Sequence, residues 1–183
     1  MCDGHSNSLC LECGLCCNGV IFANGQLQPE DDPARLRSLG LKYPPKRNSK
    51  IKNQKFLQPC AAFDGCRCKI YSERPKYCRA FECLLLKSVR AGQTDMAGAL
   101  RMVRTARHRV EKVKRLLRDL GDTQEDVALT VRFRKTKKRI ESGPIDGATA
   151  DSFGQLTLAV HDLNLLLSEA FYPGPAGELQ ESH

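Results

Sequence analysis

The chain has 183 residues, a formal net charge of +8 and ten cysteines. Its composition, with 41% hydrophobic and 6% aromatic residues and no tryptophan, is typical of a folded domain with an aliphatic core and excludes a disordered or fibrous protein. No apolar run approaches the ~18 residues of a membrane-spanning helix, and residues 1–8 lack the apolar segment of a secretory signal, so we expect neither membrane association nor export.

The first feature along the chain is a run of four cysteines with the spacing C-x2-C-x2-C-C, formed by Cys10, Cys13, Cys16 and Cys17. Two-residue spacing lets one turn aim two sulfurs at the same ion, and Gly14 supplies the conformational freedom of such a turn. Neighbouring side chains diverge, so Cys16 and Cys17 either serve two sites or only one of them ligates. Without an export signal we expect a reducing location, the cytoplasm, where clustered thiols bind metal more often than they form disulfides.

The next stretch, residues 24–57, is polar and contains several prolines. Acidic residues directly before Pro33 predict one short helix here, because acids and an early proline suit the first turn of a helix. From Lys42 to Lys55 there are six basic residues and no acid, which predicts an exposed loop.

A second group of cysteines follows this stretch, and its members are Cys60, Cys66, Cys68, Cys78 and Cys83. Neither group alone supplies two complete four-coordinate sites. We therefore expect the two groups to come together and a bound metal to fold residues 1–88.

The remaining hundred residues have no cysteine, and their pattern is helical. An apolar stripe with heptad spacing predicts a first helix, which is capped by Thr94 or Asp95 and ended by Gly121. The stripe consists of Met96, Ala99, Val103, Ala106, Val110, Val113, Leu117 and Leu120. A second helix is predicted from Thr123 to Ser142 and a third from Asp151 to Phe171.

Each of these helices has one apolar face, so an antiparallel helical hairpin or a three-helix bundle is the simplest assembly. The predicted fold is mainly α. It has a small irregular cysteine-rich metal-binding half at residues 1–88, a helical region at residues 93–172 and a flexible tail at residues 173–183.

Charge separates within the helical region. Residues 101–139 contain fourteen Lys or Arg and five acids, whereas residues 140–183 contain seven acids and no Lys or Arg. We expect the third helix to neutralise the first two in part. The basic run 132–139 is interpreted as a solvated helix end rather than a nucleic-acid surface, so the expected partner is a protein of unknown identity and nucleic acid is not favoured.

The passage from Cys68 to Phe81 reads C-x-I-Y-x-x-R-P-x-x-C-R-x-F. Together with the upstream C-x2-C-x2-C-C run, it resembles the CxxCxxCC cysteine-cluster family, also called the YkgJ family, whose members are described as zinc- or iron-chelating domains. The resemblance covers roughly residues 9–86, and residues 27–31 are similar to the segment that precedes the family's variable insertion. It implies zinc or iron as cofactor, with a [4Fe–4S] cluster as one form of the iron.

The resemblance implies eight thiol ligands, namely Cys10, Cys13, Cys16, Cys17, Cys60, Cys68, Cys78 and Cys83. Cys66 occupies a variable position and is an additional candidate, while Cys2 lies outside the motif. Tyr71, Arg74 and Arg79 fall within the matched motif. They are implied to surround the site, with the arginines offsetting thiolate charge and Tyr71 covering the metal.

Three functions follow from these features. The favoured one is a metal-binding protein that chelates zinc or iron through both cysteine groups. The first alternative is an Fe–S protein that transfers electrons or supports a redox enzyme. The second is an enzyme, because a related cysteine cluster occurs in flagellin lysine-N-methylases. The chain has no Gly-rich phosphate loop and no identifiable catalytic residue, so an enzyme is less favoured.

Overall fold

A computed structural model describes residues 9–44, 55–65 and 67–172 of the protein. The chain divides into two compact units. The thiol-rich unit comprises residues 1–81 and 126–128, and the helical unit comprises residues 82–125 and 129–183. In the described ranges the fold is mainly helical with one small two-stranded sheet, which confirms the predicted fold class.

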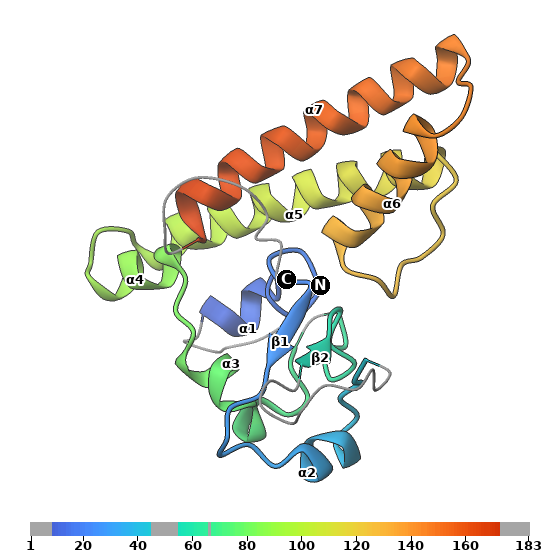
Figure 1. The fold of residues 1–183 in the computed structure, drawn as a ribbon. Coiled ribbons are helices and arrows are strands. Elements are labelled where there is room, and N and C mark those ends of the chain that lie inside the picture. Colours follow the sequence, from blue (N-terminus) through green and yellow to red (C-terminus); the bar gives the residue numbers. More distant parts are fainter. Residues whose placement is uncertain (1–8, 45–54, 66, 173–183) are drawn as a thin grey trace. The chain divides into compact units, whose positions relative to one another are not determined.

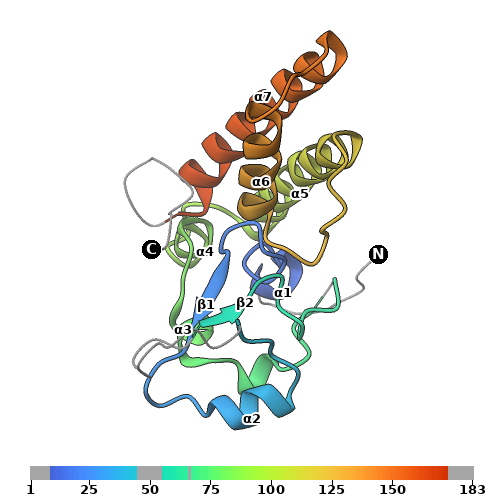
Figure 2. The same cartoon turned by 45° about the vertical axis from the view of Figure 1, so that its right-hand side comes forward.

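The regular elements in the described part of the helical unit are all helices: α4 (Leu84–Arg90), α5 (Met96–Asp119), α6 (Leu129–Glu141) and α7 (Gly147–Ala170). The two long helices α5 and α7 run side by side in opposite directions, and α4 and α6 both pack on α5 (Figures 1 and 2). The predicted association of the C-terminal helices is confirmed. None of the described helices combines the length and the apolar composition needed to cross a bilayer.

Helix α5 begins and ends where its sequence predicts. The Asp95 carboxylate caps it by accepting a hydrogen bond from the Gly98 N–H at 2.8 Å, and Gly121 follows its end with a φ of +81°. Most of the heptad stripe is buried, and its buried members are Ala99, Val103, Ala106, Val110, Val113 and Leu117. Burial of this stripe against neighbouring helices holds α5 in place.

The predicted starts of the other two long helices are wrong. Helix α6 begins at Leu129 rather than Thr123, because the Asp122 side chain accepts from the Gln124 N–H at 3.4 Å and from Arg132 Nε at 2.6 Å and holds the intervening residues in a loop. Helix α7 begins four residues before Asp151, because Asp146 caps it by accepting from the Thr149 N–H.

Ion pairs of the described α5 and α6 residues include those of Lys114 with Glu111, Arg118 with Glu125, Arg132 with Asp122 and Lys137 with Glu141. None of these four involves an acid of α7, which the sequence predicted to neutralise the other two helices in part. Arg109 does reach α7, but its guanidinium donates to the backbone carbonyl of Asp162. The carboxylates of Asp162 and Glu169 lie on exposed residues.

The thiol-rich unit is built from short elements: α1 (Leu9–Cys13), β1 (Asn24–Gln26), α2 (Pro33–Ser38), β2 (Lys55–Leu57), the 3-10 helix η2 (Tyr71–Glu73) and α3 (Lys76–Ala80). The predicted short helix is confirmed as α2. Asp32 caps it by accepting from the N–H groups of Ala34 and Arg35 at 2.8 and 3.0 Å, and Pro33 fills the first turn.

The antiparallel sheet of β1 and β2 was not predicted. Lys55, which was expected to end an exposed loop, instead begins β2, while residues 45–54 of that loop lie outside the described residues. The strands have three residues each, which is too short for the alternating pattern that identifies a strand. Gly25 of β1 pairs with Phe56 of β2, and this pairing positions the Phe56 side chain in the buried core.

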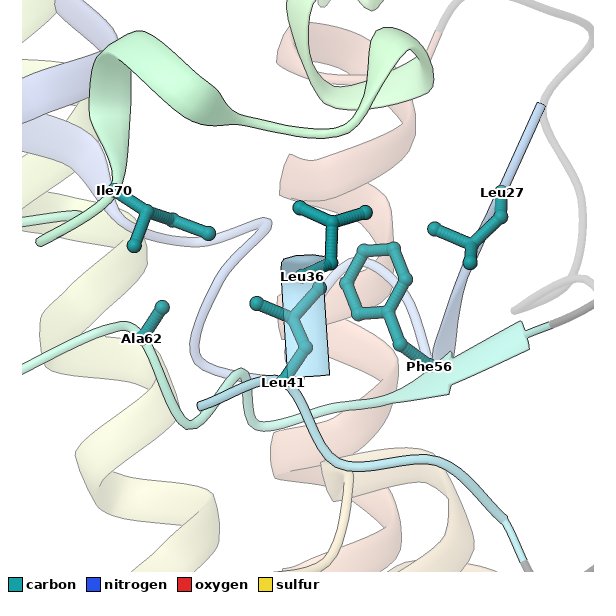
Figure 3. Packing of buried hydrophobic residues seen from close by; sticks show 6 residues of the cluster. All are labelled: Leu27, Leu36, Leu41, Phe56, Ala62 and Ile70. Carbon is teal, nitrogen blue, oxygen red and sulfur yellow. The ribbon is translucent and has the colours of Figure 1, made fainter. Parts of the chain in front are cut away.

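A small cluster of buried side chains packs together within this unit (Figure 3), formed by Leu27, Leu36, Leu41, Phe56, Ala62 and Ile70. Three candidate metal ligands, Cys60, Cys68 and Cys78, pack against the same cluster. The core therefore places thiols that come from different parts of the chain.

Replacement of Gly25 by alanine should destabilise the thiol-rich unit. A Cβ at this position would lie 2.0 Å from Cζ of Phe56, whose side chain is 1% exposed. The ring must move into a packed core, which costs about 1–3 kcal/mol. Urea unfolding checks this value. The double variant G25A/F56L should recover part of the loss, and equal stability of G25A and wild type would contradict the packing.

Candidate metal centre

The two cysteine groups are joined through their backbones. The N–H of Cys60 donates to the carbonyl oxygen of Cys17 at 2.7 Å. On the side of the first group, Gly14 follows α1 with a φ of +67°, and its carbonyl oxygen accepts from the N–H groups of Cys17 and Asn18 at 3.0 and 2.9 Å. This turn brings Cys17 from the first group to the beginning of the second.

Gly14 is required for a second reason that the sequence did not reveal. A Cβ there would lie 2.5 Å from Cζ of Phe63, so the ring packs directly on the glycine. Phe63 belongs to a turn in which its N–H donates to the Cys60 carbonyl at 2.9 Å and its backbone bridges to Cys68. One aromatic side chain thus packs the cysteine turn of the first group against the loop of the second.

Asp31 positions the helix that carries Cys78. One of its carboxylate oxygens accepts from the Lys76 N–H, the first residue of α3, and the other accepts from the Gln28 N–H, both at 2.8 Å. Lys76 also forms an ion pair with Glu30. Residues 27–31 therefore fix the start of α3. In the sequence, this segment was noted only for its similarity to the segment before the family's insertion.

The thiols of Cys17, Cys60, Cys68 and Cys78 influence one another in every pairwise combination, and together they form the four-thiol set. Burial is the largest cause that raises the pKa of Cys17 far above its ordinary value, followed by repulsion from Cys68, Cys60, Cys78 and Cys13. Burial likewise raises the pKa of Cys78 to about 12, with Cys60 and Cys68 contributing. Cys60, Cys68 and Cys78 also pack against one buried cluster, so these thiols share a partly desolvated environment.

Backbone donors are already directed at two of these sulfurs. Burial raises the pKa of Cys60 and Cys68, but the N–H groups of Ala62 and Phe63 lower it for Cys60, and the N–H of Ile70 lowers it for Cys68. Hydrogen bonds of this kind stabilise a thiolate, and a metal requires its thiol ligands in that form.

Arg74 is the cation that acts on the four-thiol set. Its guanidinium lies 3.5 Å from the centre of the Tyr71 ring, and its Nε donates to the Tyr71 carbonyl at 2.8 Å. The charge of Arg74 lowers the pKa of both Cys68 and Cys78. Arg79, the other arginine of the motif, is exposed on α3.

A group of three aromatic rings lies beside the motif. Phe22 contacts Tyr77 and Phe81 edge-on, with ring centres 6.2 and 5.0 Å apart, and Tyr77 stacks on Phe81. Burial raises the pKa of Tyr77, and the thiols of Cys16 and Cys78 raise it further. Phe22 was not identified from the sequence because it lies outside both cysteine motifs.

The other predicted ligands of the first group lie on or next to α1. Cys13, buried at the end of α1, raises the pKa of Cys17, and Cys16 acts on Tyr77 as Cys78 does. Cys10 is exposed on α1. Cys83 belongs to the helical unit, where it caps α4 and its Sγ accepts from the Leu86 N–H at 3.4 Å. Cys2 and Cys66 lie outside the described residues.

The four-thiol set fits zinc or iron in donor type, because both metals accept tetrahedral sets of thiolates. Cys17, Cys60, Cys68 and Cys78 are all in the thiol form, not in disulfides. As the side chains stand, no group of three or more His, Cys, Asp or Glu within the described ranges is arranged to hold an ion.

Metal binding should release at least about two protons per ion at pH 9, because the pKa of Cys17 lies far above its ordinary value and that of Cys78 is raised to about 12. A raised pKa keeps a thiol protonated until the pH exceeds that pKa, so an ion must displace the proton, and affinity falls as the pH falls. Ordinary thiols with a pKa near 8.5 would be mostly ionised at pH 9 and would release only about one proton. Calorimetric titration with metal at pH 9, in buffers of different ionisation enthalpy, counts these protons, and a value near one would contradict the raised pKa values.

Comparison with known proteins gives one match. The model of a family described as "CxxCxxCC: Putative zinc- or iron-chelating domain" matches residues 9–101. No curated protein and no solved structure matches the chain. The matched range covers slightly more than half of the chain and contains all members of the four-thiol set.

Proposed function

The chain belongs to the CxxCxxCC family of zinc- or iron-chelating domains, and we propose that it chelates one zinc or iron ion through Cys17, Cys60, Cys68 and Cys78. The observation that carries the proposal is the meeting of thiols from both cysteine groups. Cys60, Cys68 and Cys78 pack against one buried cluster, and the Cys60 N–H donates to the Cys17 carbonyl. The raised pKa values of these thiols agree with this packing. Four thiolates complete a tetrahedral site without any further ligand. The remaining implied ligands, Cys10, Cys13, Cys16 and Cys83, stay predictions for a second ion.

The surroundings of the four thiols support this function. A four-thiolate site with a divalent ion has a net charge near −2, and the Arg74 guanidinium offsets part of it. The backbone N–H groups directed at Cys60 and Cys68 stabilise the thiolates further. The role that we propose for the ion is structural, because it ties the turn after α1 to α3 and to the loop between them.

The core of the thiol-rich unit is small, so a bound ion would add stability that the core does not supply. A unit of this size rarely obtains more than about 3–5 kcal/mol from its core, whereas binding of a structural zinc supplies about 10–16 kcal/mol at neutral pH. The proposal places the protein in a reducing compartment such as the cytoplasm, because the four thiols must stay reduced to bind.

Anaerobic purification followed by metal analysis and absorption spectroscopy tests the proposal. A colourless protein with zinc, or a protein with iron but no acid-labile sulfide, supports a four-thiolate site. Purified protein that holds no metal and takes up neither Zn²⁺ nor Fe²⁺ would overturn chelation. About four irons with an equal amount of sulfide per chain would replace the single ion by an Fe–S cluster.

A further inference from the structure

Five basic side chains line one face of α5 and form what we name the α5 basic stripe: Arg101, Arg104, His108, Lys112 and Arg115. At 3.6 residues per turn they fall within an arc of about 80° and extend over about 21 Å along the helix axis. All five residues are exposed. The buried face of α5, which contains Val103, Val110 and Leu117, lies opposite the stripe.

No partner in the described part of the chain neutralises the stripe. The side chains of Arg101, Arg104, Lys112 and Arg115 form no ion pair or hydrogen bond with any described residue. Two acids of α5 lie at or beside this face. Glu111 pairs with Lys114, and Asp119, one turn after Arg115, lies at the end of the helix. These four positively charged side chains therefore face solvent and take no part in the ion pairs or hydrogen bonds between described residues.

The basic run at residues 132–139 is, by contrast, mostly engaged within the helical unit. Arg132 pairs with Asp122, Lys135 donates to Gln124, Lys137 pairs with Glu141, and Arg139 donates to the Leu120 carbonyl. The cations available for an external anion are thus concentrated on α5 and not in the run that is most prominent in the sequence.

The residue types of the α5 basic stripe favour one kind of partner. Between residues 101 and 115, each exposed residue of α5 is charged or polar. A protein partner is disfavoured, because the centres of protein–protein interfaces are depleted of charge and rich in aromatic anchors. A membrane surface is disfavoured, because a helix that binds it needs apolar side chains. Single-stranded nucleic acid is disfavoured, because it is bound by aromatic stacking. Contacts to the phosphates of a duplex need only Arg and Lys.

We propose that the α5 basic stripe binds the phosphate backbone of a double-stranded nucleic acid without reading its base sequence. The stripe is straight, and its four fixed charges follow one another at about 4.5, 12 and 4.5 Å along the axis, with His108 between the second and the third. Several phosphates can therefore be contacted by one helix face. This surface belongs to the helical unit and does not depend on the proposed metal site.

Fluorescence polarisation with the full-length, metal-loaded protein and a labelled 20-base-pair DNA duplex of arbitrary sequence tests this proposal. Four phosphate contacts predict a slope near −4 for the logarithm of affinity against the logarithm of salt concentration. Affinity should therefore fall by about a hundredfold between 50 and 200 mM salt. The variant R101Q/R104Q/R115Q should reduce the slope to about −1, because each lost contact reduces it by about one unit.

The matched control is K114Q/R118Q/K137Q, which removes the same charge from cations that already have acidic partners. It should keep a slope near −4. The proposal is overturned if the control weakens binding as much as the stripe variant does, or if no binding occurs at 50 mM salt. It is also overturned if polyglutamate, or vesicles with anionic lipid, bind the stripe as tightly as the duplex, since the partner is then an acidic protein or a membrane.

Discussion

Replacement of Cys17 by serine is expected to lower the affinity for metal by at least about a hundredfold, or about 3 kcal/mol. Removal of a group that only hydrogen-bonds to a metal ligand already lowers metal affinity about 10- to 100-fold. Cys17 is itself a proposed ligand, and all other members of the four-thiol set influence its pKa. Serine keeps the size of the side chain but does not supply a thiolate. Competition with a chromophoric chelator measures the change.

The same substitution should loosen the thiol-rich unit and leave the helical unit intact. Limited proteolysis is expected to cut the C17S variant, or the wild type treated with a chelator, within residues 9–81. Far-UV circular dichroism should change little, because α5, α6 and α7 all belong to the helical unit. Retention of full protease resistance after complete removal of the metal would contradict a folding role for the ion.

Cys10→Ser is the matched control for Cys17→Ser, because Cys10 is an exposed thiol on α1 in the same unit. The resemblance counts both residues as ligands, whereas the four-thiol set contains only Cys17. The C10S variant should keep its ion with affinity close to that of wild type. An equal loss in both variants would mean that the ion at Cys17 also needs Cys10, and the four-thiol set would be wrong.

Replacement of Asp122 by alanine is expected to destabilise the helical unit by about 3–5 kcal/mol. Asp122 accepts from Arg132 Nε at 2.6 Å, and the two side chains are only 7% and 2% exposed. Nη2 of Arg132 already lacks a hydrogen-bond partner. Removal of the carboxylate therefore leaves a buried cation without its counter-ion and releases the loop that precedes α6. Urea unfolding, monitored by helical signal, gives the change.

Two companion variants separate the buried charge from other effects. The double variant D122A/R132M removes both charges and should recover much of the stability, because an apolar pair of similar volume avoids the cost of desolvation. Glu125→Ala breaks an exposed ion pair with Arg118 and should change the stability little, because solvent screens the pair. A loss in D122A no larger than that in E125A would show that the pair does not stabilise the unit.

The elements that could be predicted are those whose signal is local. The heptad spacing of α5 and its Asp95 cap lie within one helix, and Asp32 with Pro33 marks the start of α2 in consecutive residues. The start of α6 could not be predicted, since it depends on the contact of Asp122 with Arg132. The sheet was missed because Gly25 and Phe56 meet across a long insertion and have no pattern of their own.

The candidate site also has a part that could be predicted from local sequence and a part that could not. The spacing of the cysteines and the resemblance indicated which thiols to consider, but not which of them meet. The four-thiol set depends on contacts between distant residues, such as the packing of Phe63 on Gly14 and the hydrogen bond from the Lys76 N–H to Asp31. Neither Phe63 nor Asp31 carries a metal-binding side-chain pattern, so only the fold reveals their roles.

X-ray absorption at the metal edge of the purified protein tests the central claim most directly. Four thiolates around one zinc ion predict a first shell of four sulfurs at about 2.3 Å, with no nitrogen or oxygen at the shorter distances of about 2.0–2.2 Å. In protein loaded with one ion per chain, the same shell should be present in the C10S variant and should lose sulfur in C17S. A shell with nitrogen or oxygen ligands in the wild type, or one that keeps four sulfurs in C17S, would contradict chelation by Cys17, Cys60, Cys68 and Cys78.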